Sequence, residues 1–420
     1  MRILIKNIRS IIGVTKYGTL RKTGEAMSEV GTIDDAWILI DGERISDLGL
    51  MDSCPSAEDA EMIDAGGGMV LPSFCDSHTH IVFAGSRERE FLDKIEGKSY
   101  AEIAANGGGI LNSADLLHDT PEDELYLQAM ERVNEMIAKG TGAMEIKSGY
   151  GLTTEDELKI LRVIRRIRET SPAIIRATFL GAHAVGRAFT GRQDEYVNYV
   201  CNDMIPAIAA ADKKNHIADF IDVFCEEGFF TPEETDKILS AGERYGLGVK
   251  LHANQLAVSG GVQVGVRHNA LSVDHLESTT DEEIRILKGS KTMPTMLPGA
   301  SFFLRMQYGK AKDFINAGLG VALASDYNPG SSPCGDMRFV MALGCIQMRL
   351  TPVQALNACT LNSAYAMGIS DIVGSIEKGK MANLIITLPV PSLNWIPYCY
   401  QSPFINKVIL KGKEIRSKFL

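Results

Sequence analysis

The amino-acid sequence predicts an α/β fold, a (β/α)8 TIM-like barrel with a small β-sandwich domain formed by both termini. Eight short apolar segments alternate with amphipathic helical patterns in the middle of the chain. Their number, and the roughly 300 residues that they span, match such a barrel. An open doubly wound sheet is the alternative, but it usually carries a glycine-rich phosphate-binding turn after its first strand. Here that place holds His78 and His80.

The elements of the barrel follow one another in a regular order. The predicted strands are residues 70–74, 143–147, 174–180, 220–225, 248–252, 271–274, 292–297 and 321–325. The clearest predicted helices are residues 122–139, 155–169, 232–245 and 281–288. Strands that alternate with helices in this way favour a parallel sheet with helices outside it.

Both ends of the chain are rich in short strands and turns. Residues 37–45 predict a hairpin with an Asp-Gly turn at Asp41 and Gly42, and residues 407–414 predict a second hairpin at Gly412. We therefore expect residues 1–64 and 373–420 to form one β domain around a barrel of residues 65–372.

Composition excludes several classes of function. A net charge of −10 without a basic stretch argues against nucleic acid as a partner. No apolar run approaches the roughly 18 residues that a membrane helix requires, and charges interrupt the first residues too often for a signal-peptide core. The 8 cysteines are scattered without a paired pattern. These observations predict a cytoplasmic protein with reduced thiols and no membrane partner.

The most informative motif is His78-Thr79-His80, which follows an apolar strand-like run. Residues two apart in an extended segment point the same way, so both imidazoles can bind one metal ion. In a barrel, the residues just after the strands meet at one mouth, where active sites lie. The positions there that carry chemistry are His78, His80, His183, His252, His275 and Asp326.

His78, His80, His252 and Asp326 form a nitrogen and carboxylate ligand set that suits zinc or ferrous iron. His275 and His183 remain for acid–base work or substrate contact. A single histidine is more often a hydrogen-bonded core residue, but five of the 8 histidines fall at strand ends.

Other polar residues leave alternatives open. His118, His216 and His268 lie in helical or loop sequence and predict no site. Glu226 and Glu227 follow the fourth strand and either reach the pocket or form a solvated rim. Lys147 predicts a buried cation or ion-pair partner and not a metal ligand. Gly107 to Gly109 predict a mobile segment near the pocket.

The strand-by-strand order of these residues resembles the amidohydrolase superfamily, and four segments are similar to its imidazolonepropionase family. The segments are residues 76–87, 145–152, 180–183 and 325–331, and the resemblance extends from about Asp64 to Gly379. The run Lys147-Ser148-Gly149-Tyr150-Gly151-Leu152 is specific, whereas His-x-His is shared by the whole superfamily. Binuclear members carry a bridging lysine after strand four, and residues 224–226 offer none.

The resemblance implies a small-molecule substrate, 4-imidazolone-5-propanoate, which is hydrolysed to N-formimidoyl-L-glutamate. It also implies a water activated by one zinc or iron ion per chain, and a homodimer. It implies that His78, His80, His252 and Asp326 bind the metal, and that His275 and Asp326 are catalytic. The substrate contacts that it implies are Arg87, Tyr150, His183, Gln255, Asn328, Gly330 and Ser331. Some relatives carry Glu at the position of Gln255, and a glutamine cannot act as a base.

The mechanism expected from these residues uses a metal to lower the pKa of water. Asp326 takes a proton from that water, while His275 polarises the carbonyl or shuttles the proton. Arg87, with Tyr150 and His183, would hold the propionate tail, because a guanidinium fits a carboxylate with two hydrogen bonds.

Two rival functions remain. Another mononuclear amidohydrolase, such as a cyclic amide hydrolase or nucleobase deaminase, would share the ligand set. A deaminase acts on neutral rings and does not need the carboxylate clamp of Arg87 and Tyr150. A catalytically inactive barrel would lack a ligand or His275, and every such position is filled.

Overall fold

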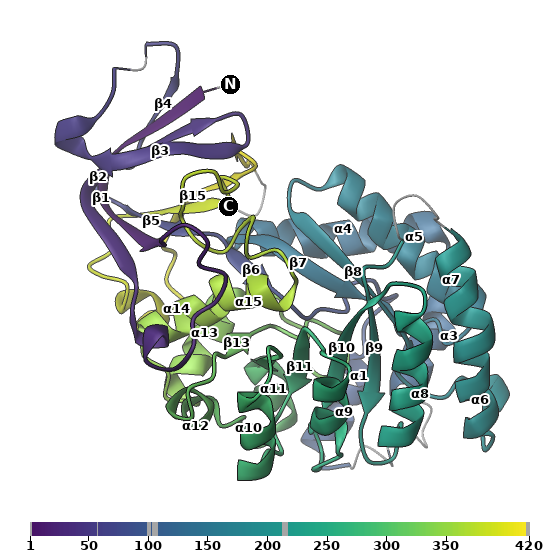
Figure 1. Cartoon of the computed structure of the whole chain (residues 1–420). Coiled ribbons are helices and arrows are strands. Elements are labelled where there is room, and N and C mark those ends of the chain that lie inside the picture. The colour runs from purple at the N-terminus through teal and green to yellow at the C-terminus, as the bar shows by residue number, and fades with distance from the viewer. Residues whose placement is uncertain (1, 57, 99–101, 103–107, 212–216, 417–420) are drawn as a thin grey trace.

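The computed structural model describes the whole chain except residues 1, 57, 99–101, 103–107, 212–216 and 417–420. The described strands form two sheets of eight strands each, one a parallel barrel and the other a mixed sheet built from both ends of the chain. Figure 1 shows the barrel enclosed by helices and the mixed sheet beside it. The predicted α/β barrel with a terminal β unit is confirmed.

In the barrel, each strand pairs in parallel with its neighbour in sequence. Its strands are β6 (Phe74–Asp76), β7 (Thr141–Lys147), β8 (Ile174–Ala182), β9 (Phe220–Cys225), β10 (Gly248–Ala253), β11 (Ser272–His275), β12 (Met293–Met296) and β13 (Ala322–Leu323). Between the two ends of this series, a parallel bridge joins Thr79 to Tyr327. The backbone N–H of Asp326 also donates to the carbonyl of His78 (3.0 Å). The barrel therefore closes at the histidine motif.

Most of the helices cover the outside of the barrel, and several begin with a capping box. At α10, the Thr280 hydroxyl and the Glu283 carboxylate satisfy backbone N–H groups that the first helical turn leaves unpaired. The helices are α1 (Glu88–Ile95), α3 (Ile110–Asp119), α4 (Glu122–Ala138), α5 (Thr154–Thr170), α6 (Gln193–Tyr199), α7 (Ile205–Ala211), α8 (Pro232–Glu243), α9 (Gly261–Arg267), α10 (Asp281–Lys288), α11 (Pro298–Leu304), α12 (Ala311–Asn316), α13 (Met337–Ile346), α14 (Pro352–Cys359), α15 (Leu361–Ala366) and α16 (Trp395–Tyr398). Short helical turns lie at Gly24–Ser28, Met51–Ser53, Arg187–Phe189 and Val200–Met204.

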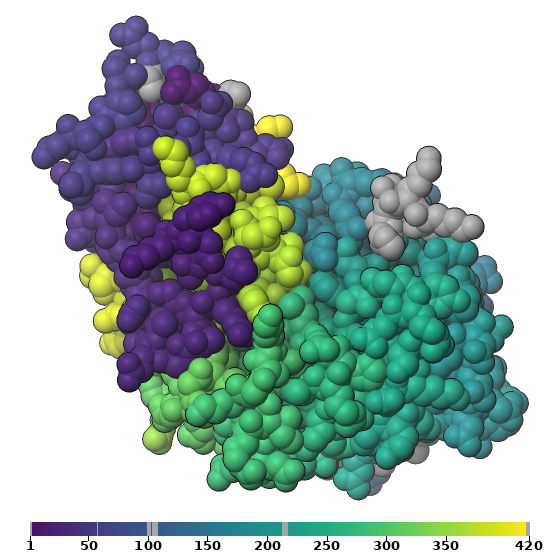
Figure 2. Space-filling model, viewed as in Figure 1, coloured from purple at the N-terminus to yellow at the C-terminus, as the bar shows by residue number. Residues whose placement is uncertain are grey.

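The mixed sheet joins the two ends of the chain in the order β16-β15-β14-β5-β1-β2-β3, with β4 paired to β1. Its strands are β1 (Arg2–Val14), β2 (Gly31–Asp41), β3 (Arg44–Leu50), β4 (Glu61–Asp64), β5 (Met69–Pro72), β14 (Leu384–Thr387), β15 (Ile405–Leu410) and β16 (Lys413–Glu414). Both predicted hairpins are confirmed. Figure 2 shows atoms from the two ends of the chain side by side in one lobe.

Two predictions need correction. The predicted first barrel strand, residues 70–74, is wrong, because β5 pairs with β1 and β14 in the mixed sheet and the barrel begins at Phe74. The run is apolar throughout because both sheets bury it, so hydrophobicity alone does not reveal the break at Ser73. The predicted β-sandwich is one continuous mixed sheet. The division at residues 64 and 372 stays a prediction.

In the part of the chain that the structure describes, no helix combines the length and the apolar character needed to cross a membrane.

Candidate active site

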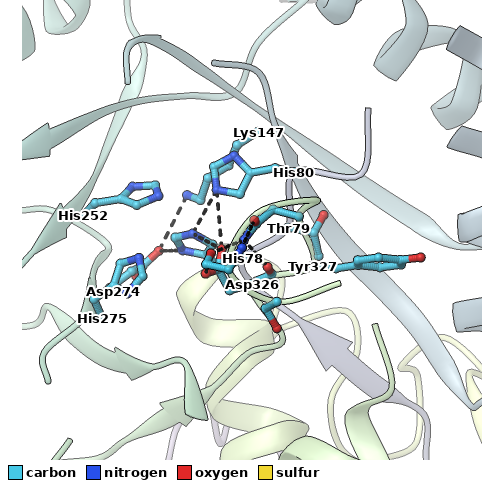
Figure 3. A network of polar contacts seen from close by, with 12 residues as sticks. His78, Thr79, His80, Lys147, His252, Asp274, His275, Asp326 and Tyr327 are labelled. Carbon is cyan, nitrogen blue, oxygen red and sulfur yellow. Dashed lines mark hydrogen bonds and ion pairs between the residues drawn. The ribbon is translucent and has the colours of Figure 1, made fainter. Parts of the chain in front are cut away.

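The two histidines of the motif leave β6 with their Nε2 atoms facing each other, 3.3 Å apart. Asp326, which follows β13, brings its Oδ1 to 3.6 Å from His78 Nε2 and 3.7 Å from His80 Nε2. Figure 3 shows the two rings and this carboxylate grouped together. His78 is fully buried beneath the pocket floor, and its Nδ1 lies 2.7 Å from Asp274 Oδ2.

The other two histidines of the cluster come from neighbouring strands. His252 on β10 packs its ring 4.3 Å from that of His78, and its Nδ1 lies 2.9 Å from Asp222 Oδ2. His275, the last residue of β11, places its ring 5.6 Å from that of His78. Its Nδ1 lies 3.4 Å from Glu277, which is also buried.

These residues fit a divalent metal. The buried His252 Nε2 and His80 Nδ1 have no hydrogen-bond partner among the described residues. Ligand atoms within 4.8 Å of one another form two overlapping groups, His78 with His80 and Asp326, and His78 with His252 and His275. Imidazole nitrogens with a carboxylate oxygen are ligands that zinc and iron accept.

Burial shifts the protonation of this cluster. It lowers the pKa of His78 and of His80 well below the ordinary value, which favours the neutral rings that bind metals. It also raises the pKa of Asp326. Burial lowers the pKa of His275 as well, but the charge of Glu277 and its contact with the ring outweigh this, so the net shift is upward.

A cavity of about 620 Å³ opens above the cluster. All the substrate-contact residues predicted from the sequence line this cavity, and so do four of the predicted catalytic or metal-binding residues. The lining includes Arg87, Tyr150, His183, Gln255, Asn328, Gly330, Ser331, His80, His252, His275 and Asp326. His183 follows β8, its ring stacks 5.1 Å from that of His80, and burial lowers its pKa to about 3.

Two cationic side chains, Arg87 and Lys94, line one side of this cavity. The guanidinium of Arg87 donates to Glu90 Oε2 from Nε (2.9 Å) and from Nη2 (2.6 Å), and both side chains are buried. Lys94 also lines the cavity and donates to the carbonyl of Gly330 (2.5 Å). A Cβ at Gly330 would lie 2.1 Å from Arg87 Nη1, so glycine lets this loop approach the guanidinium.

Two lining loops are each wrapped around a buried glutamate. The carboxylate of Glu157 accepts backbone N–H groups from Gly149, Gly151 and Leu152 at 2.7–3.2 Å, and this fixes the loop that carries Tyr150. Glu226 accepts those of residues 255–257 at 2.7–3.2 Å and fixes the loop that begins with Gln255. Glu226 is thus a buried loop anchor, whereas Glu227 is exposed.

Asn328 organises the loop after β13. Its Oδ1 accepts the backbone N–H groups of Gly330 and Ser331, both at 2.8 Å, and its Nδ2 donates to the carbonyl of Asp326 (2.7 Å). The Ser331 hydroxyl donates to Asp326 Oδ2 (3.2 Å). These contacts hold the Asp326 carboxylate in place.

Sequence reasoning missed Glu90, Lys94 and the charged residues below the histidines. Those buried residues are Glu145, Asp222, Lys250 and Asp274. Glu145 lies two residues before Lys147 on β7, and Lys250 lies two residues before His252 on β10. Residues two apart on a strand point to the same side, so each pair shares the inward face of its strand. Glu145 and Lys250 could have been predicted from this spacing, because each is a charged residue in an otherwise apolar strand, two positions before a residue already singled out.

The remaining predictions have plain outcomes. Lys147 is a buried ion-pair partner, as predicted. His118 and His268 pair with carboxylates away from the cavity. His216 and Gly107 lie outside the described residues, and the N–H of Gly109 donates to Glu90 (3.0 Å).

Comparison with known proteins identifies the family. The model of the amidohydrolase family matches residues 69–415. An imidazolonepropionase of Flavobacterium johnsoniae is 50% identical over 412 residues, which is 98% of this chain and 99% of that protein. The chain belongs to the imidazolonepropionases of the amidohydrolase family. An imidazolonepropionase of Thermoanaerobacter pseudethanolicus is 38% identical over 97% of this chain and 96% of its own.

Solved structures show the same fold at low identity. A triazine hydrolase variant matches with a TM-score of 0.75 and 16% identity, over 100% of this chain and 95% of its own. Guanine deaminase of E. coli matches with a TM-score of 0.74 and 14% identity, over 100% of both chains. The family is metal-dependent, and the histidine-rich cluster is its potential metal site in this hydrolase.

Proposed function

We propose that the chain hydrolyses a ring carbon–nitrogen bond of 4-imidazolone-5-propanoate to give N-formimidoyl-L-glutamate in histidine degradation. The observation that carries this proposal is the near-full-length identity, up to 50%, with proteins named imidazolonepropionase. The cavity supports it, because metal-ligating groups lie at its floor and cationic side chains line its wall.

His78, His80, His252 and Asp326 are the proposed ligands of one zinc or iron ion per chain. The unpartnered Nε2 of His252 and the facing nitrogens of His78 and His80 support this assignment. His275 could join the ligands, since its nitrogen is grouped with those of His78 and His252. We assign it to catalysis because it faces the cavity and is backed by Glu277.

The chemistry that such a metal supplies is a lowered pKa of bound water, from roughly 16 to about 7. Asp326 accepts the proton of the attacking water. His275 polarises the attacked carbonyl or passes the proton to the ring nitrogen, which leaves as the carbon–nitrogen bond breaks. Gln255 hydrogen-bonds the ring but has no basic oxygen that could take the proton.

Arg87, with Tyr150 and His183, is the proposed site for the propionate carboxylate. Glu90 orients the guanidinium through two hydrogen bonds. Lys94, at the carbonyl of Gly330, adds positive charge on the same side. Asn328, Gly330 and Ser331 form the part of the cavity wall that lies between these cationic groups and Asp326.

The alternative is another mononuclear amidohydrolase, a cyclic amide hydrolase or a nucleobase deaminase. The structural likeness to guanine deaminase favours it only at the level of fold, at 14% identity. The test is turnover by the metal-loaded protein of 4-imidazolone-5-propanoate against guanine and adenosine. We expect loss of imidazolone absorbance and no deamination, and the reverse result would overturn the proposal.

We propose further that the protein is a cytoplasmic homodimer that binds neither nucleic acid nor membrane. Its 8 cysteines are free thiols, which suits a reducing compartment. Exposed Phe302, Ile346 and Tyr398 on neighbouring helices offer an apolar surface for a second copy. The division into residues 1–64, 65–372 and 373–420 is part of the same proposal.

A further inference from the structure

A group of five charged side chains lies fully buried under the histidines, and the proposed mechanism uses none of them. It contains two ammonium groups and three carboxylates, all at most 1% exposed. They project from four of the barrel strands, and the members are Glu145 and Lys147 on β7, Asp222 on β9, Lys250 on β10 and Asp274 on β11. Buried charges are costly unless they are paired, so such a group needs a reason to be there.

Lys147 is the centre of this group. Its Nζ lies 2.6 Å from Glu145 Oε1, 2.7 Å from Asp222 Oδ2 and 3.6 Å from Asp274 Oδ2. Figure 3 shows the ion pair between this lysine and Asp274 as a dashed line.

The two aspartate oxygens that contact Lys147 are the same atoms that hold two histidines. Asp222 Oδ2 lies 2.9 Å from His252 Nδ1, and Asp274 Oδ2 lies 2.7 Å from His78 Nδ1. A single ammonium thus joins both carboxylate–imidazole pairs. When Nδ1–H is donated to a carboxylate, the lone pair of Nε2 is left to face the cluster, which is the orientation that a metal requires.

Lys250 does not duplicate this arrangement. It donates to the carbonyl of Ser77 (2.9 Å) and pairs with Glu145, and it lies 3.8 Å from Asp274 Oδ2. Among the lysines that the structure describes, only Lys147 forms an ion pair with Asp222. Without the charge of Lys147, Asp222 would lose this lysine partner, and Asp274 would keep only the more distant Lys250 as a lysine partner among the described residues.

We propose that Lys147 is a positioning residue of the metal site, which holds Asp222 and Asp274 so that His252 and His78 present their Nε2 atoms to one ion. This inference rests on the proposed metal-dependent function. Lys147 is not among the residues that line the cavity, and it acts through the two aspartates.

The test is the affinity of the metal-free protein for Zn²⁺, measured by competition with a chromophoric chelator. Lys147→Met should bind Zn²⁺ about 10–100-fold more weakly than the unchanged chain, which is the usual effect of losing such a supporting partner. Lys380→Met is the matched control, because Lys380 is also buried but its partners are Ser370, Ser375 and Glu377, none of which lines the cavity. Its affinity should not change.

A second pair of variants covers the case in which Lys147→Met does not fold. Asp222→Asn keeps the shape of the side chain but removes its charge, and it should also weaken Zn²⁺ binding. Where both single variants fold, the double variant should lose less affinity than the product of the two single losses, because Lys147 acts partly through Asp222.

Unchanged affinity in folded Lys147→Met or in Asp222→Asn, or independent losses in the double variant, would overturn the inference. Absence of Zn²⁺ binding by the unchanged chain would instead overturn the proposed function, and the inference with it.

Discussion

Asp326 and His275 both hold left-handed backbone conformations, with φ of 55° and 88°. A non-glycine residue in this region costs on the order of 1–3 kcal/mol, and such residues gather at active sites. Two hydrogen bonds stabilise this conformation at Asp326. Its N–H donates to the carbonyl of His78, and the Asn328 side-chain amide donates to its carbonyl. The carboxylate is therefore aimed at the histidines before any ligand arrives.

Replacing Asp326 with Ala should abolish activity and weaken metal binding, because the variant loses a ligand and the proton acceptor together. Metal content after dialysis and turnover are the measurements, with Asp326→Asn as a variant of matched volume. Full turnover with the metal retained would mean that Asp326 is neither ligand nor base.

His275→Ala separates catalysis from metal binding. A histidine that moves a proton contributes on the order of 10²–10⁴ in rate, so the variant should keep its metal and lose about that much in kcat. Elemental analysis of the purified variant decides the matter. If the metal leaves with the ring, His275 belongs with His78 and His252 in the ligand group.

Arg87→Met tests recognition of the propionate. Loss of a charge-assisted contact costs roughly 1.5–3 kcal/mol, which is about ten- to a hundredfold in kcat/KM. The loss should appear with 4-imidazolone-5-propanoate and not with an imidazolone that lacks the carboxylate. Arg89→Met, at an exposed neighbour, is the control. Equal losses on both substrates would show that Arg87 shapes the loop instead.

At the scale of elements, the loops after β7 and β10 share one device, a buried glutamate that gathers three backbone N–H groups. Loops tied in this way keep Tyr150 and Gln255 at the cavity wall without substrate. Rigid placement before binding reduces the entropy lost when a ligand is held.

Glu226→Gln should therefore raise KM by about tenfold and change kcat less, because one acceptor oxygen is lost and the loop loosens. Steady-state kinetics measure both constants. Glu227→Gln, at the exposed neighbouring position, should match the unchanged chain. A fall in kcat with constant KM would place Glu226 in the chemistry.

The bounds of helices and strands were predicted best where the hydrophobic periodicity and the capping or turn residues indicate the same ends. The strand Phe220–Cys225 and the helix Asp281–Lys288 have the bounds predicted for them. The first barrel strand was misplaced because both sheets bury residues 69–74. The histidines could be predicted because residues after barrel strands converge. The contact of Lys147 with Asp222, 75 residues away, depends on the packed interior and has no local signal.

At the scale of the whole molecule, the buried histidines make the metal-free protein sensitive to acid. Burial lowers the pKa of His78, His80 and His183 from the ordinary 6.5, to about 3 for His183. Between the folded and unfolded pKa values the unfolded chain binds more protons, so stability falls as pH falls.

The free energy of unfolding of the metal-free protein should therefore be independent of these histidines above about pH 6.5, and it should decrease as the pH is lowered below that value. Urea unfolding at a series of pH values measures this. Higher stability at acidic than at neutral pH would contradict the buried, neutral state of these rings.

The central claim is that one metal at the histidine cluster drives hydrolysis of the imidazolone ring. The most direct test is titration of metal-free protein with Zn²⁺ or Fe²⁺ while the absorbance of 4-imidazolone-5-propanoate is followed. Activity should rise in proportion to metal and level off at one equivalent per chain, with N-formimidoyl-L-glutamate as the product. A plateau at two equivalents, or no turnover by the fully loaded chain, would contradict it.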